Sequence, residues 1–166
     1  ETIKATVYFP NVCDKAAALD MELTYDATKI DFVSLEKGVA LKKAIEAQQN
    51  GSVYSEGTKT KGKIQWSIAG SNNYSFVGVF AVVTFKVRAS AVNGPTNIDL
   101  AVKNAANSGY VDITSQISVE NATVEIVRDS AKDFEYKLNG DKTGYIITKY
   151  NCATVADLTV PSYHDG

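Results

Sequence analysis

Leu19-Asp20-Met21-Glu22-Leu23-Thr24-Tyr25 is the stretch of sequence that decides the fold. Apolar and polar residues alternate along it without a break. Because successive side chains of a β-strand point to opposite faces, the four apolar residues are predicted to point inward and the three polar ones outward. This pattern is typical of a strand in an antiparallel sheet with one face on the core and the other in solvent.

The same alternation recurs on both sides of this stretch, between turn residues such as Pro10-Asn11 and Asn93-Gly94-Pro95. About eight such segments, separated by turns every roughly 8–12 residues, indicate an all-β fold, an antiparallel β-sandwich. The predicted strands are residues 2–9, 19–25, 32–35, 52–59, 63–69, 79–89, 97–104 and 119–127. Residues 39–49 instead carry apolar side chains at helical spacing and predict one short helix.

The last part of the chain has a different pattern. Residues 128–133 are charged and lack alternation, so we interpret them as a linker after a domain of residues 1–127. Two strand-like segments, 134–138 and 145–148, flank Asn139-Gly140-Asp141-Lys142-Thr143-Gly144. This turn-rich loop predicts a β-hairpin rather than a calcium loop, because helices are expected on both sides of an EF-hand loop. Residues 134–166 must dock on the sandwich or belong to a longer domain, since a lone hairpin is unstable.

Composition narrows the classes of function. A formal net charge of −2 provides no basic field for nucleic acid, and no apolar run is long enough to span a membrane. Glu1 opens directly into a strand-like segment, so we expect a mature or excised fragment without a signal peptide. The only histidine is His164, near the end of the chain, so neither a catalytic triad nor a metal site is expected. We predict no enzyme activity and no cofactor.

The two cysteines, Cys13 and Cys152, leave two alternatives. They form a disulfide that ties the C-terminal segment to the sandwich, or they are two separate thiols. Sequence spacing does not decide between these, because a disulfide depends on approach in three dimensions.

Residues 1–127 resemble a cohesin domain. The resemblance is carried by Ala16–Gly38 (AAALDMELTYDATKIDFVSLEKG), by Gly78–Val87 (GVFAVVTFKV) and by residues 94–104 with the closing segment 119–124. It implies a sandwich of jelly-roll topology. It also implies a bacterial, extracellular module, secreted or attached to the cell surface, that binds a dockerin-bearing protein in a cellulosome-like assembly, with calcium carried by the partner. Two features differ from the family: cohesins usually have one more strand before the segment equivalent to residues 2–9, and Ala27 replaces a common proline.

The resemblance also implies where the partner binds, since dockerins dock on one flat sheet face and its adjoining loops. The residues that it assigns to partner binding are Ala18, Asp20, Glu22, Tyr54, Lys59, Ser71, Asn72, Asn73 and Tyr74. Asp20 falls where cohesins commonly carry a residue that hydrogen-bonds the dockerin. The alternative is that Asp20 and Glu22 only keep the outer face soluble. Trp66 is in register with Ile64 and Ile68 and is therefore predicted to lie in the core rather than on a carbohydrate platform.

Other functions stay open at this point. A carbohydrate-binding module on a related sandwich would need a planar row of exposed aromatic residues. A structural spacer of a surface adhesin would leave binding to its neighbours, including polysaccharide binding. Residues 134–166 resemble the start of a BspA-type leucine-rich repeat, a cell-surface module of gut and oral bacteria, and one partial repeat does not form a stable solenoid alone.

Overall fold

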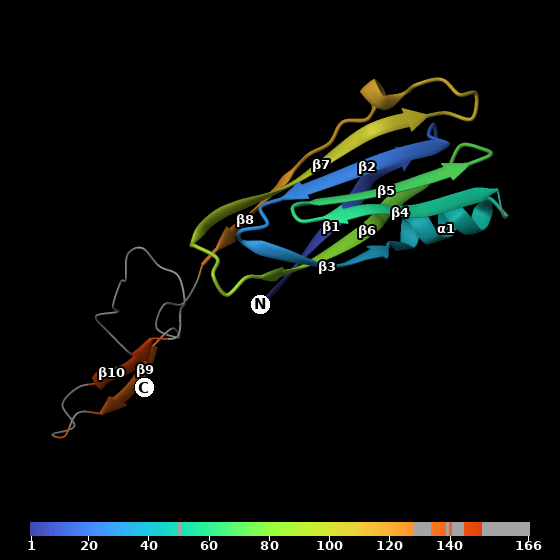
Figure 1. Ribbon diagram of the computed structural model, residues 1–166. Helices are drawn as coiled ribbons and strands as arrows, with labels where there is room; N and C mark the ends of the chain where they lie inside the picture. Colours follow the sequence, from blue (N-terminus) through green and yellow to red (C-terminus); the bar gives the residue numbers. More distant parts are fainter. Residues whose placement is uncertain (50, 128–133, 139, 141–144, 151–166) are drawn as a thin grey trace.

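The protein folds as a sandwich of two antiparallel β-sheets (Figure 1). The computed structural model describes residues 1–49, 51–127, 134–138, 140 and 145–150. The smaller sheet has the order β1-β6-β3 and the larger one has the order β4-β5-β2-β7-β8. The strands of the sandwich are β1 (Thr2–Cys13), β2 (Ala18–Tyr25), β3 (Ile30–Lys37), β4 (Ser52–Thr60), β5 (Lys63–Gly70), β6 (Phe76–Val87), β7 (Gly94–Ala106) and β8 (Ala122–Ile126). The all-β prediction is confirmed.

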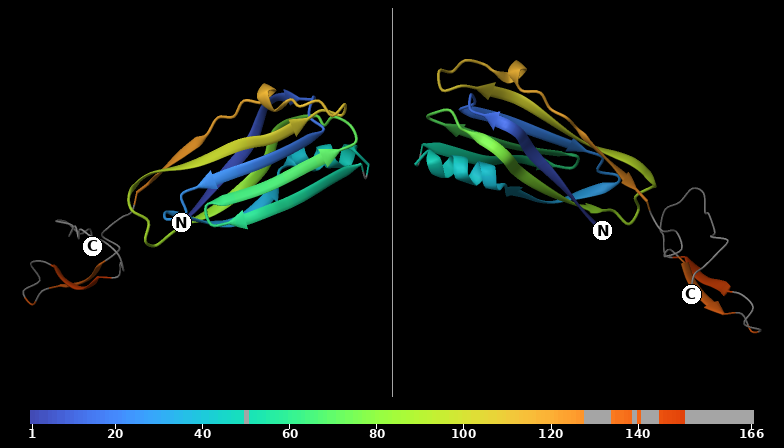
Figure 2. Two further views of the ribbon diagram at one scale, coloured as in Figure 1. Left: turned by 45° about the horizontal axis from the view of Figure 1, so that its top comes forward. Right: turned by 180° about the vertical axis from the view of Figure 1, so that it is seen from behind.

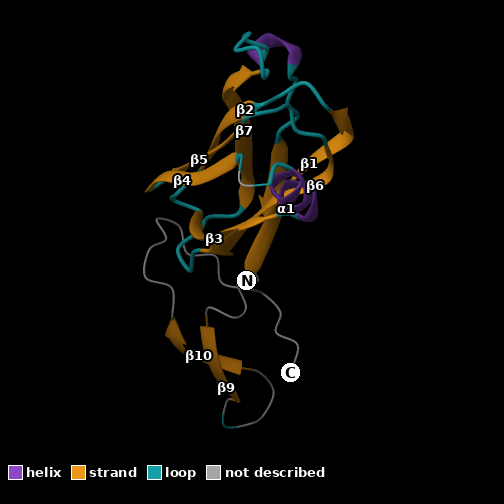
Figure 3. Ribbon diagram, turned by 90° about the vertical axis from the view of Figure 1, so that its right-hand side faces the viewer, coloured by secondary structure: helices purple, strands orange, loops and turns teal. Residues whose placement is uncertain are grey.

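The core lies between the two layers, which Figure 3 shows nearly end on. β2 follows the predicted alternation, with Leu19, Met21 and Leu23 buried. From the smaller sheet, Phe76 and Phe80 contribute rings whose centroids are 5.0 Å apart in an edge-to-face arrangement. Aromatic pairs of this geometry add to the free energy gained from burial alone. Alternating strands from both sheets thus bury one shared apolar layer.

Several predicted boundaries were wrong by a few residues. Pro10 and Asn11 do not end β1, which continues to Cys13 after an irregularity in its pairing with β6. Proline is tolerated there because β1 is an edge strand, where one side of the backbone needs no ladder partner. β6 begins at Phe76, three residues before the predicted start, and β8 is shorter than the predicted segment 119–127.

The predicted helix is α1 (Val39–Ala47), which packs on β6 through Ala40, Leu41 and Ala44. Gly38 precedes it and donates its backbone N–H to the carbonyl of Phe80 at 2.7 Å. A Cβ atom at Gly38 would overlap the backbone of Val79 and Phe80. The entry to the helix therefore requires glycine, because the two backbones approach closely.

β1 has one strand neighbour, β6, and a groove of about 570 Å³ runs along its other edge. The inner face of β7 contributes Leu100 and Val102 to the lining of this groove. The groove exists because the three-stranded sheet is narrower than the five-stranded one, as the view from behind shows (Figure 2, right). The inner face of β7 is therefore less fully covered than that of β2, and both residues are only half-buried.

The C-terminal hairpin is confirmed as an antiparallel pair, β9 (Phe134–Leu138) with β10 (Tyr145–Tyr150). Cys13 is half-buried at the end of β1. Cys152, His164 and the predicted linker 128–133 lie outside the described residues. The alternatives for the two cysteines therefore stay open.

Candidate protein-interaction surface

The solvent face of the five-stranded sheet is formed by the side chains that alternate with the core. We call this surface the outer wall. Its members on four of the five strands follow from the strand register and the burial pattern: Val53 and Ser55 of β4; Lys63, Gln65, Ser67 and Ala69 of β5; Ala18, Asp20, Glu22 and Thr24 of β2; and Asp99, Ala101, Asn104 and Ala106 of β7. A pairing irregularity between Asp20 and Met21 also exposes Lys103 of β7. Ala18, Asp20 and Glu22 lie on this wall, as predicted.

Cross-strand pairing arranges the outer wall in rows of different chemistry. The first row is small and apolar: Val53 pairs with Ala69, Ala69 with Ala18, and Ala18 with Ala106. The next row is polar and consists of Ser55, Ser67, Asp20 and Asn104. The third row contains Gln65, Glu22 and Ala101. The wall thus changes from apolar to charged along the strand direction.

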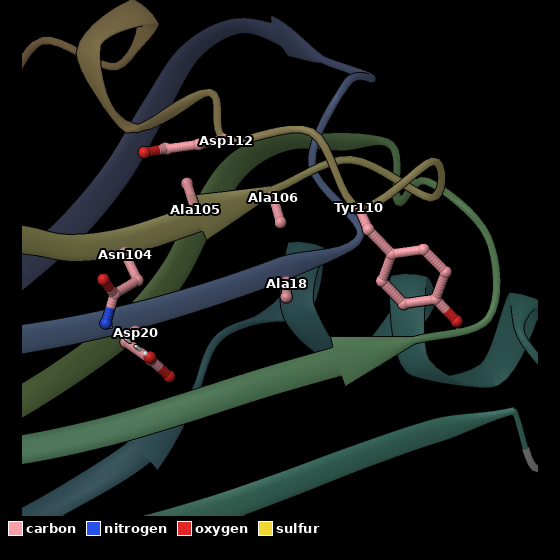
Figure 4. A pocket seen from close by; sticks show the side chains of 7 residues that line it. All are labelled: Ala18, Asp20, Asn104, Ala105, Ala106, Tyr110 and Asp112. Atoms are coloured by element: carbon pink, nitrogen blue, oxygen red, sulfur yellow. Dashed lines mark hydrogen bonds between the residues drawn. The ribbon is translucent and has the colours of Figure 1, made fainter.

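Asp20 stands at the side of a shallow hollow of about 260 Å³ (Figure 4). Asn104 Nδ2 donates a hydrogen bond of 3.1 Å to Asp20 Oδ2. Figure 4 shows both side chains on the same side of the sheet, with Ala18 between Asp20 and the ring of Tyr110. The other carboxylate oxygen of Asp20, Oδ1, has no hydrogen-bond partner among the described residues, so the group is available to accept a hydrogen bond from another protein.

Tyr110 is the most exposed large hydrophobic side chain among the described residues of the sandwich, with 95% of its surface accessible. Its loop is nevertheless held by hydrogen bonds. Asn107 Oδ1 accepts from the N–H groups of Gly109 and Val111, and the N–H of Tyr110 donates to the carbonyl of Asn107. Tyr110 has φ +60°, a conformation that costs energy for a residue with a Cβ. A rigid loop that presents an exposed aromatic ring is a typical anchor for a protein partner.

Asp112 is also at the hollow and ends this loop. Its Oδ1 accepts a hydrogen bond of 2.8 Å from the backbone N–H of Thr114. This hydrogen bond, with a further contribution from the Thr114 hydroxyl, lowers the pKa of the Asp112 carboxyl below its usual range. Among the described residues that line it, the hollow therefore has two acidic side chains, Asp20 and Asp112, and no basic one.

Glu22, two residues from Asp20 on β2, has a different environment. Lys63 Nζ lies 3.0 Å from Glu22 Oε2, and Lys103 Nζ lies 3.9 Å from Oε1. Gln65 Nε2 donates to Oε2 at 2.8 Å. The hydrogen bond from Lys63, followed by that from Gln65 and the positive charges of both lysines, lowers the pKa of Glu22 despite partial desolvation.

Two of the predicted interface residues do not face outward. Tyr54 pairs with Ile68 and Lys59 pairs with Ile64, and both isoleucines point into the core. The Tyr54 ring is half-buried beneath Lys37, whose Nζ lies 4.3 Å from the ring centroid. Burial, with the nearby Glu56 charge, raises the pKa of Tyr54 to about 12. The outward positions of β4 are instead Val53 and Ser55.

The prediction that Tyr74 lies in the interface was also wrong, because Tyr74 is a core residue with 2% of its surface exposed. Its ring stacks on Phe76 with centroids 5.2 Å apart, and its hydroxyl shares a hydrogen bond of 2.5 Å with Ser52. Burial raises the pKa of the Tyr74 phenol. The close approach of its ring to Gly70, where a Cβ would collide, explains how a tyrosine in a loop reaches the core.

Ser71, Asn72 and Asn73 form an exposed loop, as predicted. Asn73 Oδ1 accepts a hydrogen bond of 2.8 Å from the backbone N–H of Ser108. This bond ties the loop to the one that carries Tyr110. The two loops therefore form one rim at the apolar end of the outer wall.

The prediction that Trp66 lies in the core is confirmed, since 1% of its surface is exposed. Within the described ranges, no group of three or more histidine, cysteine or acidic residues is arranged to hold a metal ion. No helix among the described residues is both long and apolar enough to cross a membrane.

The family model named "Cohesin domain" matches residues 1–135. The chain belongs to the cohesin family. No curated protein matches this cohesin.

Solved cohesin structures share its fold at low sequence identity. The sixth cohesin of Acetivibrio cellulolyticus scaffoldin B, solved with a Cel5 dockerin mutant, is 20% identical with a TM-score of 0.60, covering 76% of this chain and 89% of that one. A Clostridium acetobutylicum cohesin is 19% identical with a TM-score of 0.60, covering 76% and 81%. A non-cellulosomal cohesin of the archaeon Archaeoglobus fulgidus is 19% identical with a TM-score of 0.55, covering 79% and 84%.

Sequence reasoning missed Tyr110, Asn104 and Asp112. Asn104 was the last residue of a predicted strand, but the register that places it beside Asp20 depends on an irregularity that periodicity does not reveal. Tyr110 follows Asn107-Ser108-Gly109, a cluster of turn residues. An aromatic residue directly after such a cluster was the available signal for an exposed loop tip.

Proposed function

We propose that this cohesin is a non-catalytic module that binds a calcium-loaded dockerin through its outer wall, with Asp20 and Tyr110 as the principal contacts. The calcium belongs to the partner. Family membership supports the class of partner, and several solved relatives are complexes of a cohesin with a dockerin.

The observation that carries the proposal is the pairing of an oriented carboxylate with a presented aromatic ring on one side of the sheet. Asp20 accepts hydrogen bonds from donors on a partner. Tyr110 offers a large contact area at low cost in conformational entropy. The small side chains of the first row, Val53, Ala69, Ala18 and Ala106, let a partner element approach the sheet closely. A shallow, mixed surface of this kind suits a protein more than a small substrate.

The proposed location is extracellular, on a bacterial surface or in a secreted, cellulosome-like assembly. In this proposal the sandwich comprises residues 1–127, and the hairpin β9–β10 belongs to a second module that follows it. The sequence of that second module, residues 134–166, resembles the start of a BspA-type leucine-rich repeat. Neighbouring modules of this kind would supply any binding to polysaccharide. The carbohydrate-binding alternative is disfavoured because the exposed aromatic side chains of the described sandwich residues 1–127, Tyr8 and Tyr110, lie on different sheets or their loops and form no row.

The test is a calorimetric titration of the full chain with dockerins encoded by the same genome, in calcium and in excess chelator. We expect at least one dockerin to bind with calcium and none to bind without it. Asp20→Ala should weaken that binding at least tenfold. Glu36→Gln, which removes an exposed charge from the opposite sheet, is the matched control and should bind like the wild type.

Three results would overturn the proposal. The first is that no dockerin binds. The second is binding that Asp20→Ala and Tyr110→Ala leave unchanged, which would move the site off the outer wall. The third is retention of the chain on insoluble polysaccharide without any dockerin, which would favour the carbohydrate-binding module.

A further inference from the structure

A small cluster of charges lies on the outer wall beyond Asp20, away from the Tyr110 rim. Glu22 is at its centre, and Lys63 of β5 and Lys103 of β7 reach it from either side. The two ammonium groups share one carboxylate, so the cluster carries a formal charge of +1. Neither lysine forms an ion pair with Asp20 or Asp99, the other carboxylates on the wall along β2 and β7.

The lysines are accessible while the carboxylate is not. The side chains of Lys63 and Lys103 are 44% and 53% exposed, whereas that of Glu22 is 12% exposed. Lys103 Nζ, at 3.9 Å from Glu22 Oε1, is beyond hydrogen-bonding distance. Its ammonium group therefore keeps donors free toward solvent, as far as the described residues show. A partner approaching this part of the wall meets positive charge first.

From this geometry, and resting on the proposed dockerin binding, we infer that Lys63 and Lys103 form a subsite that receives a carboxylate of the partner. Glu22 is not itself a contact for the partner. It holds the two lysines over the wall and reduces their repulsion, because a shared counter-ion stabilises both charges.

The position of this subsite constrains the partner. Asp20 and Glu22 are two residues apart on one strand, which corresponds to roughly 7 Å. Side chains three or four residues apart on a helix are separated by a similar distance, about 5–6 Å. A partner helix therefore matches the wall when it presents a hydrogen-bond donor for Asp20 and an acidic residue one turn away for the lysines. The opposite charges of the two subsites favour one direction of that helix over the reverse.

The experiment uses the full chain and the calcium-loaded dockerin that binds it most tightly. The double variant Lys63→Met/Lys103→Met keeps the apolar stems of the lysines and removes the charges. We expect about a tenfold loss of affinity at low salt, which shrinks at about 0.5 M salt because screening weakens the wild-type interaction. Lys86→Met, which removes an exposed lysine from the opposite sheet, is the control for net charge.

Glu22→Gln gives a result of opposite sign. It keeps the hydrogen-bonding shape of the side chain and raises the net charge of the cluster, so we expect binding to tighten severalfold. Thermal unfolding of each variant shows whether it is folded. Unchanged affinity in the double lysine variant, or weaker binding in Glu22→Gln, overturns the inference. Both results are compatible with an Asp20-dependent dockerin site, whereas failure of every dockerin to bind the wild type removes the proposed function and this inference together.

Discussion

The side-chain amide of Asn104 donates a hydrogen bond to the carboxylate of Asp20 across the boundary between β7 and β2. The two residues are 84 positions apart in the sequence and are brought together by a single pairing irregularity after Asp20. The bond restricts the orientation of a carboxylate that would otherwise rotate freely on the sheet surface. Asn104 is therefore a positioning residue for the proposed dockerin contact.

Asn104→Ala should lower dockerin affinity without unfolding the protein. Loss of one hydrogen bond to a charged group corresponds to about 1 kcal/mol or somewhat more, or roughly five- to tenfold in affinity. The cost should fall on binding because Asn104 is exposed. Calorimetry of Asn104→Ala, Asp20→Ala and the double variant checks this. If the two effects simply add, Asn104 does not act through Asp20.

Tyr110→Ala should remove a binding anchor and leave stability almost unchanged, since the ring is 95% exposed. A hot-spot tyrosine contributes about 2 kcal/mol or more, which is roughly thirtyfold in dissociation constant. Tyr110→Phe separates the ring from the hydroxyl. Tyr8→Ala, at an exposed tyrosine of the smaller sheet, is the matched control. Equal affinities for Tyr110→Ala and Tyr8→Ala would show that the loop takes no part in recognition.

Two glycines should respond differently to alanine. At Gly38 a Cβ overlaps the backbone of β6, so Gly38→Ala should cost about 3 kcal/mol and lower Tm by about 6–12 °C. At Gly78 the φ of +91° is strained for alanine, but the space around it is open. Gly78→Ala should therefore cost only about 1 kcal/mol. Differential scanning calorimetry of the pair is the measurement. Equal Tm values would mean that α1 shifts to accommodate the methyl group.

The raised pKa of the Tyr54 phenol leads us to expect a loss of stability at alkaline pH. Its pKa is raised from 10.0 to about 12 in the folded protein, first by burial and then by Glu56. Between these pH values the unfolded chain loses the phenolic proton and the folded protein retains it. The contribution of the Tyr54 phenol to the free energy of unfolding is therefore fully present below pH 10 and declines as pH rises toward 12.

Urea unfolding of the wild type and Tyr54→Phe at pH 9 and pH 11 tests this expectation. The free energy of unfolding should fall less steeply in Tyr54→Phe, which has no phenolic proton to lose. Tyr74, whose pKa burial also raises, remains in both proteins and accounts for part of the decline they share. Identical slopes in the two proteins would contradict the buried position of the Tyr54 ring.

The strands of this cohesin were predictable from sequence because apolar residues in their period-two alternation mark the buried positions and polar residues mark the exposed ones. β2 was placed within one residue, and the inward direction of Trp66 followed from its register with Ile64. The hairpin β9–β10 was equally clear from its turn residues. These features depend on local sequence, which a single chain displays in full.

The candidate site was harder to predict because it depends on pairing between distant segments. Tyr54 was placed on the wrong face, since its neighbours in sequence did not reveal that it pairs opposite Ile68. Tyr74 looks like a loop residue until the close approach to Gly70 brings its ring into the core. The converging positions of Asn104, Asp20 and Tyr110 come from register and a loop conformation, neither of which periodicity encodes.

Along the strands of the five-stranded sheet, residues that build the interior alternate with residues of the solvent-facing outer wall, where the proposed partner binds. Substitutions at the second set can accumulate without disturbing the packing of the first. A lineage of such modules can therefore change its choice of partner by ordinary point mutations while its architecture persists. The solved relatives keep this fold with only about one residue in five identical.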